Sequence, residues 1–149
     1  MYKRILVPID GSSSSRRGLR EAIRLAKNQK ARLCLLHVVE ELFIAQTGEA
    51  VIFAEDMFKA MRASGRAILS RAAAAARKRG VRARTVLVES IAMPAADVIV
   101  REARKWKADL IVIGTHGRRG LRRVVMGSDA EQVVRNAPAP VLLIRAAAR

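Results

Sequence analysis

The sequence predicts an α/β fold, in which a doubly wound parallel sheet of five strands carries helices on both faces. Two observations support this prediction: short apolar segments alternate with longer amphipathic segments, and the apolar segments lack the polar alternation of a half-exposed strand. Alternation of strands and helices is typical of parallel sheets with right-handed crossovers. Since no linker, repeat or shift in composition divides the chain, we expect a single domain over residues 1–149.

The predicted strands are five runs of mostly aliphatic residues. The first run, residues 5–9, is apolar on both faces and ends at Asp10 and Gly11, which are typical turn residues. The run at 110–113 is the most apolar of the five. The other strands are predicted at residues 33–39, 83–88 and 141–144.

The predicted helices show apolar residues at helical spacing. The first begins within residues 12–15, four serines whose hydroxyls can accept hydrogen bonds from free backbone amides. Its apolar face is formed by Leu19, Ala22, Ile23 and Ala26. A later helix starts near Pro94, with an inner face of Val98, Ile99, Ala103 and Trp106, and a short helix holds Val133 and Val134.

A long helix is predicted between the second and third strands, and Gly80 suits its C-terminus. Eight residues at helical spacing define the stripe that we expect it to bury. They are Phe53, Met57, Ala60, Met61, Ser64, Ile68, Ala72 and Ala75.

The composition excludes several classes of protein. A hydrophobic content of 51% excludes a disordered basic tail, and an aromatic content of 3% argues against a protein that stacks bases on an aromatic platform. The 29 basic and 13 acidic residues give a net charge of +16, which leaves nucleotides, duplex backbones and acidic membrane surfaces as candidate partners.

The cysteine content and the hydropathy pattern bear on location. Cys34 is the only cysteine, so the fold does not depend on an intramolecular disulfide. The first residues carry no secretory signal pattern, and no segment approaches the about 20 apolar residues that span a bilayer. We therefore expect a cytoplasmic location without membrane insertion.

The segment after the fourth strand has the chemistry of an anion site. In open doubly wound sheets, ligands bind at the carboxyl ends of the strands, where the strand order switches direction. The segment 114–129 contains four glycines, and Gly127 and Ser128 open a helix whose free amides and dipole favour an anion. It also contains Arg118, Arg119, Arg122 and Arg123.

The two standard phosphate-binding fingerprints are missing. The sequence has no G-x-x-x-x-G-K-[ST] motif, which excludes a P-loop NTPase, and no G-x-G-x-x-G follows the first strand. The nucleotide site must therefore be of another type.

The glycines at 114, 117 and 127, followed by Ser128, form the pattern G-x2-G-x9-G-S. This pattern resembles the G-x2-G-x9-G-[ST] signature of the ATP-binding universal stress proteins. The segments ILVPIDG at 5–11, HVV at 37–39 and APVLLI at 139–144 are also similar to that family. The resemblance implies a flavodoxin-like sheet of strand order 3-2-1-4-5, a homodimer, and binding of ATP, AMP or ADP, with or without Mg²⁺.

The resemblance also implies which residues form the nucleotide site. The first part of the site, Pro8, Ile9, Asp10 and Val39, would flank the adenine and ribose. The second part would line the ribose and phosphates. With the residues beside that loop included, the second part is predicted as Ile113, Gly114, His116, Gly117, Arg118, Gly127, Ser128 and Asp129.

Structural alternatives stand beside several of these assignments. Asp10 could form an Asx turn or cap the first helix, and the glycine loop could be a simple connection. Asp129 has three alternative roles: it could hold a metal that accompanies the nucleotide, weaken nucleotide binding by charge repulsion, or only stabilise the helix dipole. Asp10 could also hold such a metal. His116 is a candidate contact rather than a base, and no metal-ligand set is evident. Core positions are expected for His37, Cys34 and Trp106.

Three functional hypotheses follow. The leading one is a nucleotide-dependent regulatory or stress-response switch, dimerised through the edge formed by Val141, Leu142, Leu143 and Ile144. The second is a non-enzymatic module with a vestigial nucleotide site, whose basic helices bind nucleic acid or an acidic partner. The acid-free basic stretch consists of Arg62, Arg66, Arg71, Arg77, Lys78, Arg79, Arg82 and Arg84 and is otherwise a solvated face. The third is an ATPase or nucleotidyl transferase; since no general base can be assigned, we expect any hydrolysis to be slow.

Overall fold

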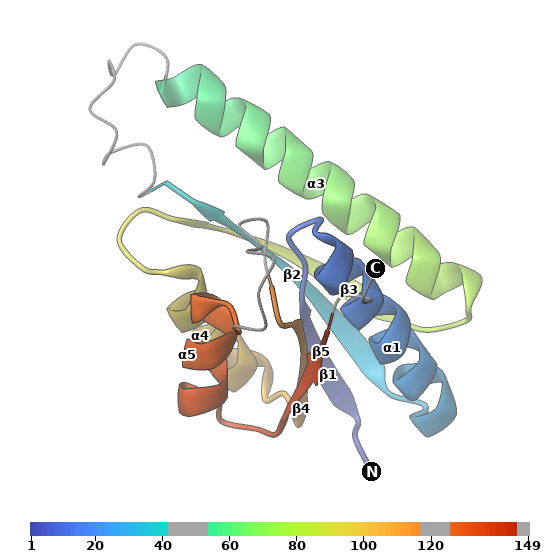
Figure 1. Ribbon diagram of the computed structural model, residues 1–149. Coiled ribbons are helices and arrows are strands. Elements are labelled where there is room, and N and C mark those ends of the chain that lie inside the picture. Colours follow the sequence, from blue (N-terminus) through green and yellow to red (C-terminus); the bar gives the residue numbers. More distant parts are fainter. Residues whose placement is uncertain (42–53, 117–125, 146–149) are drawn as a thin grey trace.

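The five strands form one parallel sheet of order β3-β2-β1-β4-β5 in the computed structural model, which describes residues 1–41, 54–116 and 126–145 (Figure 1). The predicted strand order is therefore confirmed. Aliphatic side chains on both sides of the central strands account for this arrangement, because β1 and β4 are buried on both faces. The strands are β1 (Arg4–Pro8), β2 (Arg32–Glu40), β3 (Ala83–Ser90), β4 (Leu110–Gly114) and β5 (Val141–Ile144).

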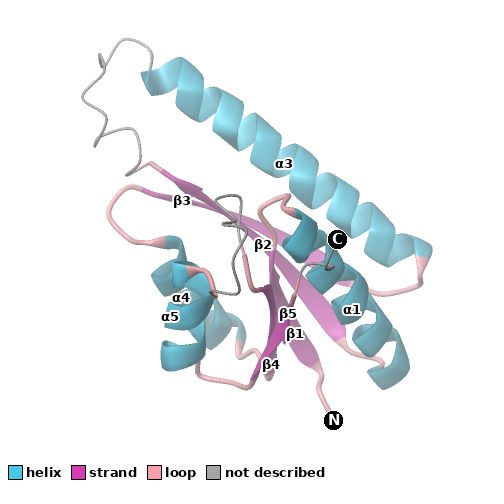
Figure 2. Cartoon of the chain, viewed as in Figure 1, coloured by secondary structure: helices cyan, strands magenta, loops and turns pink. Residues whose placement is uncertain are grey.

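Within the described residues, four helices cover the two faces of the sheet in pairs (Figure 2). One pair is α1 (Ser13–Gln29) with α3 (Ala54–Lys78), and the other is α4 (Ala95–Trp106) with α5 (Ser128–Asn136). Each pair closes its own hydrophobic core: Leu19, Ile23 and Leu69 pack against one face, and Ile99, Ala103 and Val133 against the other. The doubly wound architecture that the sequence predicts is thus observed.

The buried stripe predicted for α3 is wrong in its first half. Met57 is 46% exposed, and Ala60 and Ser64 are also exposed. Of the predicted stripe, Ile68 and Ala72 are buried, and the helix also buries Gly65, Leu69 and Ala76, which the prediction left out, against β2 and β3. The prediction failed because it followed apolar residues, whereas the contact at the middle of the helix is made by a glycine. Phe53 lies outside the described residues.

The three residues expected in the core differ in their burial. His37 is 6% exposed, and its Nδ1 lies 2.7 Å from the carbonyl oxygen of Ile9, which satisfies one ring nitrogen. Cys34 is 2% exposed. Trp106 is only half-buried, and the Arg84 guanidinium lies 5.9 Å from the centre of its ring, within cation–π range.

Within the described part of the chain, no helix combines the length and apolarity required to cross a membrane.

The Cys34 thiol is expected to be unreactive in the folded protein. Desolvation by burial raises its pKa, although the charge of Arg84 acts in the opposite direction. Because the pKa of the thiol is higher in the folded protein than in the unfolded chain, the burial of the protonated thiol contributes fully to stability at pH values below the unfolded pKa. This contribution to the free energy of unfolding is lost as the pH rises through the raised pKa of the folded protein. We expect iodoacetamide to alkylate Cys34 about 100-fold more slowly in the native protein than in protein unfolded by urea. Mass spectrometry measures the two alkylation rates. Equal rates in the two solvents would contradict the burial of this thiol.

Candidate functional site

The carboxyl ends of β1 and β4 form the switch point of the sheet. These strands are neighbours, but β1 continues into α1 on one face, whereas the chain after β4 reaches α5 on the other (Figure 1). Diverging connections of this kind mark the usual ligand position in open α/β sheets. The structure places the predicted residues Pro8, Ile9 and Asp10 on one side of this point, and Ile113, Gly114 and His116 on the other.

Asp10 shapes the turn that leads from β1 into α1. Its Oδ1 accepts a hydrogen bond from the Ser12 amide at 2.9 Å, and Gly11 has a φ of 83°, which a residue with a side chain rarely adopts. Ser12 then caps α1, because its Oγ accepts a hydrogen bond from the Ser15 amide at 3.2 Å. The Asx-turn alternative for Asp10 is therefore present in the geometry, and it fixes the carboxylate at the switch point.

The serines at the start of α1 also bind the chain that follows β4. The Ser14 hydroxyl donates to the carbonyl oxygen of His116, and the Ser12 hydroxyl lies 3.4 Å from the same oxygen. A Cβ at Gly114 would lie 2.6 Å from the Ser14 Oγ and 2.8 Å from its carbonyl carbon. Sequence reasoning assigned these serines to helix capping and missed this contact, because the two segments are about a hundred residues apart.

His116 has a buried polar atom without a partner. Its Nδ1 is 2.9 Å from the Thr115 hydroxyl, but its Nε2 is buried and makes no hydrogen bond within the described parts of the chain. The Thr115 hydroxyl can donate or accept, so Nε2 is an unsatisfied donor or acceptor in either tautomer. A buried polar atom in this state is costly, and a ligand atom within hydrogen-bond distance would remove that cost.

The N-terminus of α5 lies beside the carboxyl end of β4. The Gly127 amide donates to the Thr115 carbonyl oxygen at 2.7 Å, which brings this helix end to the end of β4. Gly127 is the N-cap of α5 and makes no side-chain cap hydrogen bond, and the dipole of a helix N-terminus favours an anion. Ser128 and Asp129 are exposed in this first turn. Asp129 and Glu131 also suit the helix dipole, which is the structural alternative for Asp129.

The apolar members of the predicted site are buried where the strands end. Ile9 is 4% exposed, Val39 is 1% exposed and Ile113 is 7% exposed, while Pro8 is half-buried. Val39 lies near the end of β2, beyond Leu36, whose carbonyl oxygen accepts the Ile9 amide at 2.8 Å. Gly117 and Arg118 lie outside the described residues, as do Arg119, Arg122 and Arg123. Among the described residues, no group of three or more His, Cys, Asp or Glu side chains could hold a metal ion.

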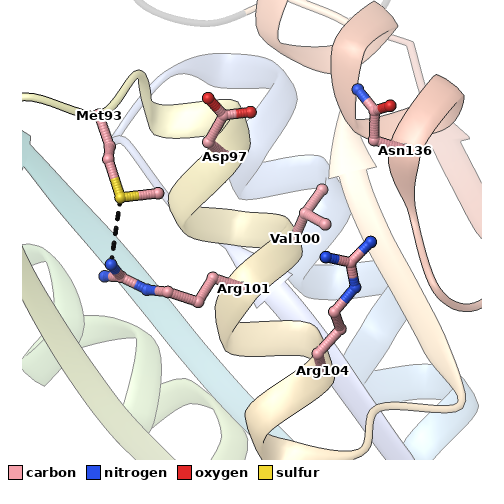
Figure 3. Close-up of a pocket in the computed structure, with 6 residues that line it drawn as sticks. All are labelled: Met93, Asp97, Val100, Arg101, Arg104 and Asn136. Carbon is pink, nitrogen blue, oxygen red and sulfur yellow. Dashed lines mark hydrogen bonds between the residues drawn. The ribbon is translucent and has the colours of Figure 1, made fainter.

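An open hollow of about 520 Å³ lies elsewhere, between α4 and α5 (Figure 3). Its lining contains none of the predicted site residues. Only Val100 of the lining is buried, and Arg101 contacts the Met93 sulfur at 3.2 Å. Small-molecule sites are usually enclosed and mostly apolar, so this hollow is a weaker candidate than the switch point. The lining residues are Met93, Asp97, Val100, Arg101, Arg104 and Asn136.

The four residues predicted as a dimer edge form β5 at the margin of the sheet. All four are half-buried. Val141 and Leu143 pack toward the α4 and α5 side, and Leu142 and Ile144 toward the α1 and α3 side. At this edge, a second copy of the chain would therefore pair mainly with the backbone groups of β5, since its apolar side chains pack against the helices of the same chain. The dimer stays a prediction.

The sequence matches known proteins over nearly its whole length. The family model described as "Universal stress protein family" matches residues 1–145. A universal stress protein of Methanocaldococcus jannaschii is 36% identical over 146 residues, which cover 97% of this chain and 83% of that protein. A universal stress protein of Bacillus subtilis is 32% identical and covers 97% of this chain and 100% of the relative.

Solved structures show the same fold. A universal stress family protein from Burkholderia pseudomallei has a TM-score of 0.78 and 34% identity, covering 96% of both chains. One from Archaeoglobus fulgidus, in complex with dAMP, has a TM-score of 0.68 and 28% identity, covering 96% of this chain and 98% of its own. A universal stress protein in complex with cAMP has a TM-score of 0.69 and 26% identity, covering 98% of both chains. Since the family model and these relatives span almost the whole sequence, the chain belongs to the universal stress protein family.

Proposed function

We propose that this protein binds an adenine nucleotide at the switch point, where the carboxyl ends of β1 and β4 lie side by side. The related universal stress proteins in complex with dAMP and cAMP support the choice of ligand. The N-terminus of α5 at the switch point supports the location, because a helix N-terminus favours an anion. Adenine and ribose would lie toward Pro8, Asp10 and Val39, and the phosphates toward Gly127 and Ser128.

The observation that carries this proposal is the Nε2 of His116, which is buried and has no hydrogen-bond partner among the residues that the structure describes. A ribose hydroxyl would satisfy it in either tautomer, since a hydroxyl donates or accepts, and a phosphate oxygen would satisfy it when Nε2 carries the proton. His116 is held for such a contact through its backbone, because its carbonyl oxygen is bound by the Ser14 hydroxyl. Its role is thus to position the ligand rather than to transfer a proton.

The proposal extends to regulation. A nucleotide at this site would contact both α1 and the segment that leads from β4, and β4 pairs with β5 at the proposed dimer edge. Occupancy would therefore be signalled to a second copy through β5, as in a stress-response switch built from one domain. Both ATP and AMP are candidates, and Mg²⁺ would accompany ATP near Asp10 and Asp129. A cytoplasmic location stays a prediction.

Calorimetric titration with AMP, cAMP and ATP, the last with and without Mg²⁺, tests the proposal. We expect His116→Ala to weaken binding by about tenfold, because it removes one buried hydrogen bond to the ligand. Gln132→Ala is the matched control, since this residue is exposed farther along α5. Sedimentation of the same samples reports the dimer. Wild-type protein that binds none of these nucleotides at millimolar concentration would remove the proposal.

A further inference from the structure

The fold divides the charge of the helices between the two faces of the sheet. The helices α1 and α3 carry eleven basic and three acidic side chains, whereas α4 and α5 carry four of each. Figure 1 shows α1 and α3 on the same side of the sheet, so these cations share one face of the molecule. The basic residues of this face are Arg16, Arg17, Arg20, Arg24, Lys27, Lys59, Arg62, Arg66, Arg71, Arg77 and Lys78.

The few acids of this face neutralise only two of its cations. Glu21 pairs with Arg24, and Arg62 lies 3.3 Å from Glu55 and 3.5 Å from Glu89 of β3. The sequence contains no acidic residue between Asp56 and Glu89. Eight exposed cations of α1 and α3 have no ion pair within the described residues. They are Arg16, Arg20, Lys27, Lys59, Arg66, Arg71, Arg77 and Lys78.

The side chains between these cations are small. Ala63, Ser64, Ala67 and Ser70 are the exposed neighbours along the middle of α3. Of the large exposed apolar residues in the described chain, only Met57 lies on α1 or α3, near the N-terminal end of α3. A protein partner needs buried aromatic or aliphatic anchors, and an interfacial helix needs an exposed apolar face. Charge without apolar anchors instead favours a phosphate backbone.

We propose that the face formed by α1 and α3 is a docking surface for the phosphate backbone of duplex nucleic acid. The 25 residues of α3 span about 37 Å, close to the about 34 Å of one duplex turn. Eight of the eleven cations are arginines, whose planar guanidinium binds phosphate through two hydrogen bonds. The low aromatic content is compatible with this mode, because backbone contacts require no base stacking.

The test measures binding of a fluorescein-labelled duplex of about two helical turns by anisotropy over a series of salt concentrations. Two charge-removal variants probe the two helices, and a third is the matched control on the other face. The α3 variant combines Arg66→Gln, Arg71→Gln and Arg77→Gln. The α1 variant combines Arg17→Gln, Arg20→Gln and Lys27→Gln. The control variant, on α4 and α5, combines Arg104→Gln, Lys105→Gln and Arg135→Gln. Each variant removes three positive charges, so net charge alone cannot separate them.

We expect the α1 and α3 variants each to lose at least about tenfold in affinity near 0.1 M salt, with the slope of log K against log [salt] reduced by about 1 to 3. The control should stay within about twofold of wild type. All three variants should keep their affinity for AMP, which makes this test independent of the nucleotide proposal.

Three results with the variants and competitors would overturn the proposal. The first is equal loss in all three variants, which would show attraction by net charge without a defined face. The second is a helix variant that behaves like the control. The third is tighter binding of poly-glutamate, or of vesicles that contain phosphatidylserine, than of the duplex at the same salt concentration. Absence of duplex binding by wild type at low salt would overturn it as well.

Discussion

Replacing Gly114 with alanine is expected to lower the free energy of unfolding by about 3 kcal/mol. The added Cβ would lie 2.8 Å from a backbone carbon and 2.9 Å from the Cβ of Ser14, distances that require the start of α1 to move. Overpacking of this kind typically costs about 1–3 kcal/mol. The shift also disturbs the bond from the Ser14 hydroxyl to the His116 carbonyl oxygen, at a cost of about 1 kcal/mol.

Thermal unfolding measures this effect, and we expect the melting temperature to fall by about 6–12 °C. Gly18→Ala is the matched control, because Gly18 lies in α1 at the same contact with β4. A Cβ at Gly18 would meet nothing closer than 3.8 Å. In a helix interior, alanine is preferred to glycine, so the control should be stabilised by about 0.5–1 kcal/mol. A Gly114→Ala protein as stable as wild type would refute the close approach of α1 and β4.

The contact between Gly114 and Ser14 could not be predicted from the sequence, whereas the strands and most helix faces could. The aliphatic runs and helical stripes predicted the strands and most helix faces, because those signals lie within each segment. The strand order came from the resemblance to the family and is observed. The role of Gly114 could not be found in this way, since its neighbour Ser14 comes from a distant segment. The resemblance to the family placed Gly114 beside the ribose and phosphates; the structure gives it a packing role, and its contact with nucleotide stays a prediction.

The candidate site was also predicted only in part. The structure brings Asp10, Gly114, His116 and Gly127 to the carboxyl ends of β1 and β4, where a doubly wound sheet was expected to bind its ligand. The hydroxyls of Ser12 and Ser14 were missed, because four consecutive serines at a helix start are already explained by capping.

The distribution of basic residues over the surface was also predicted only in part. The net charge of +16 is evident from composition, but its concentration on the α1 and α3 face depends on which helices share a side.

Gly65→Ala is the second substitution with a large expected effect, and it examines the error made in predicting the α3 stripe. A Cβ at this position would lie 2.6 Å from Cδ2 of His37 and 2.8 Å from Cδ1 of Leu87. The leucine methyl can move, but the imidazole is held by its contact with the Ile9 carbonyl oxygen at 2.7 Å. We expect a net loss of about 2 kcal/mol, because the steric cost exceeds the gain of up to about 1 kcal/mol in helix propensity.

A double-mutant cycle with His37→Ala assigns this loss to its cause. His37→Ala alone should destabilise the protein, since it opens a cavity and leaves the Ile9 carbonyl oxygen without its imidazole partner. In that background, however, Gly65→Ala meets no ring, so it should be neutral or stabilising, with a coupling energy of about 2 kcal/mol. Urea unfolding of the four proteins measures this coupling. If Gly65→Ala destabilises both backgrounds equally, His37 is not the obstacle, and α3 approaches β2 for another reason.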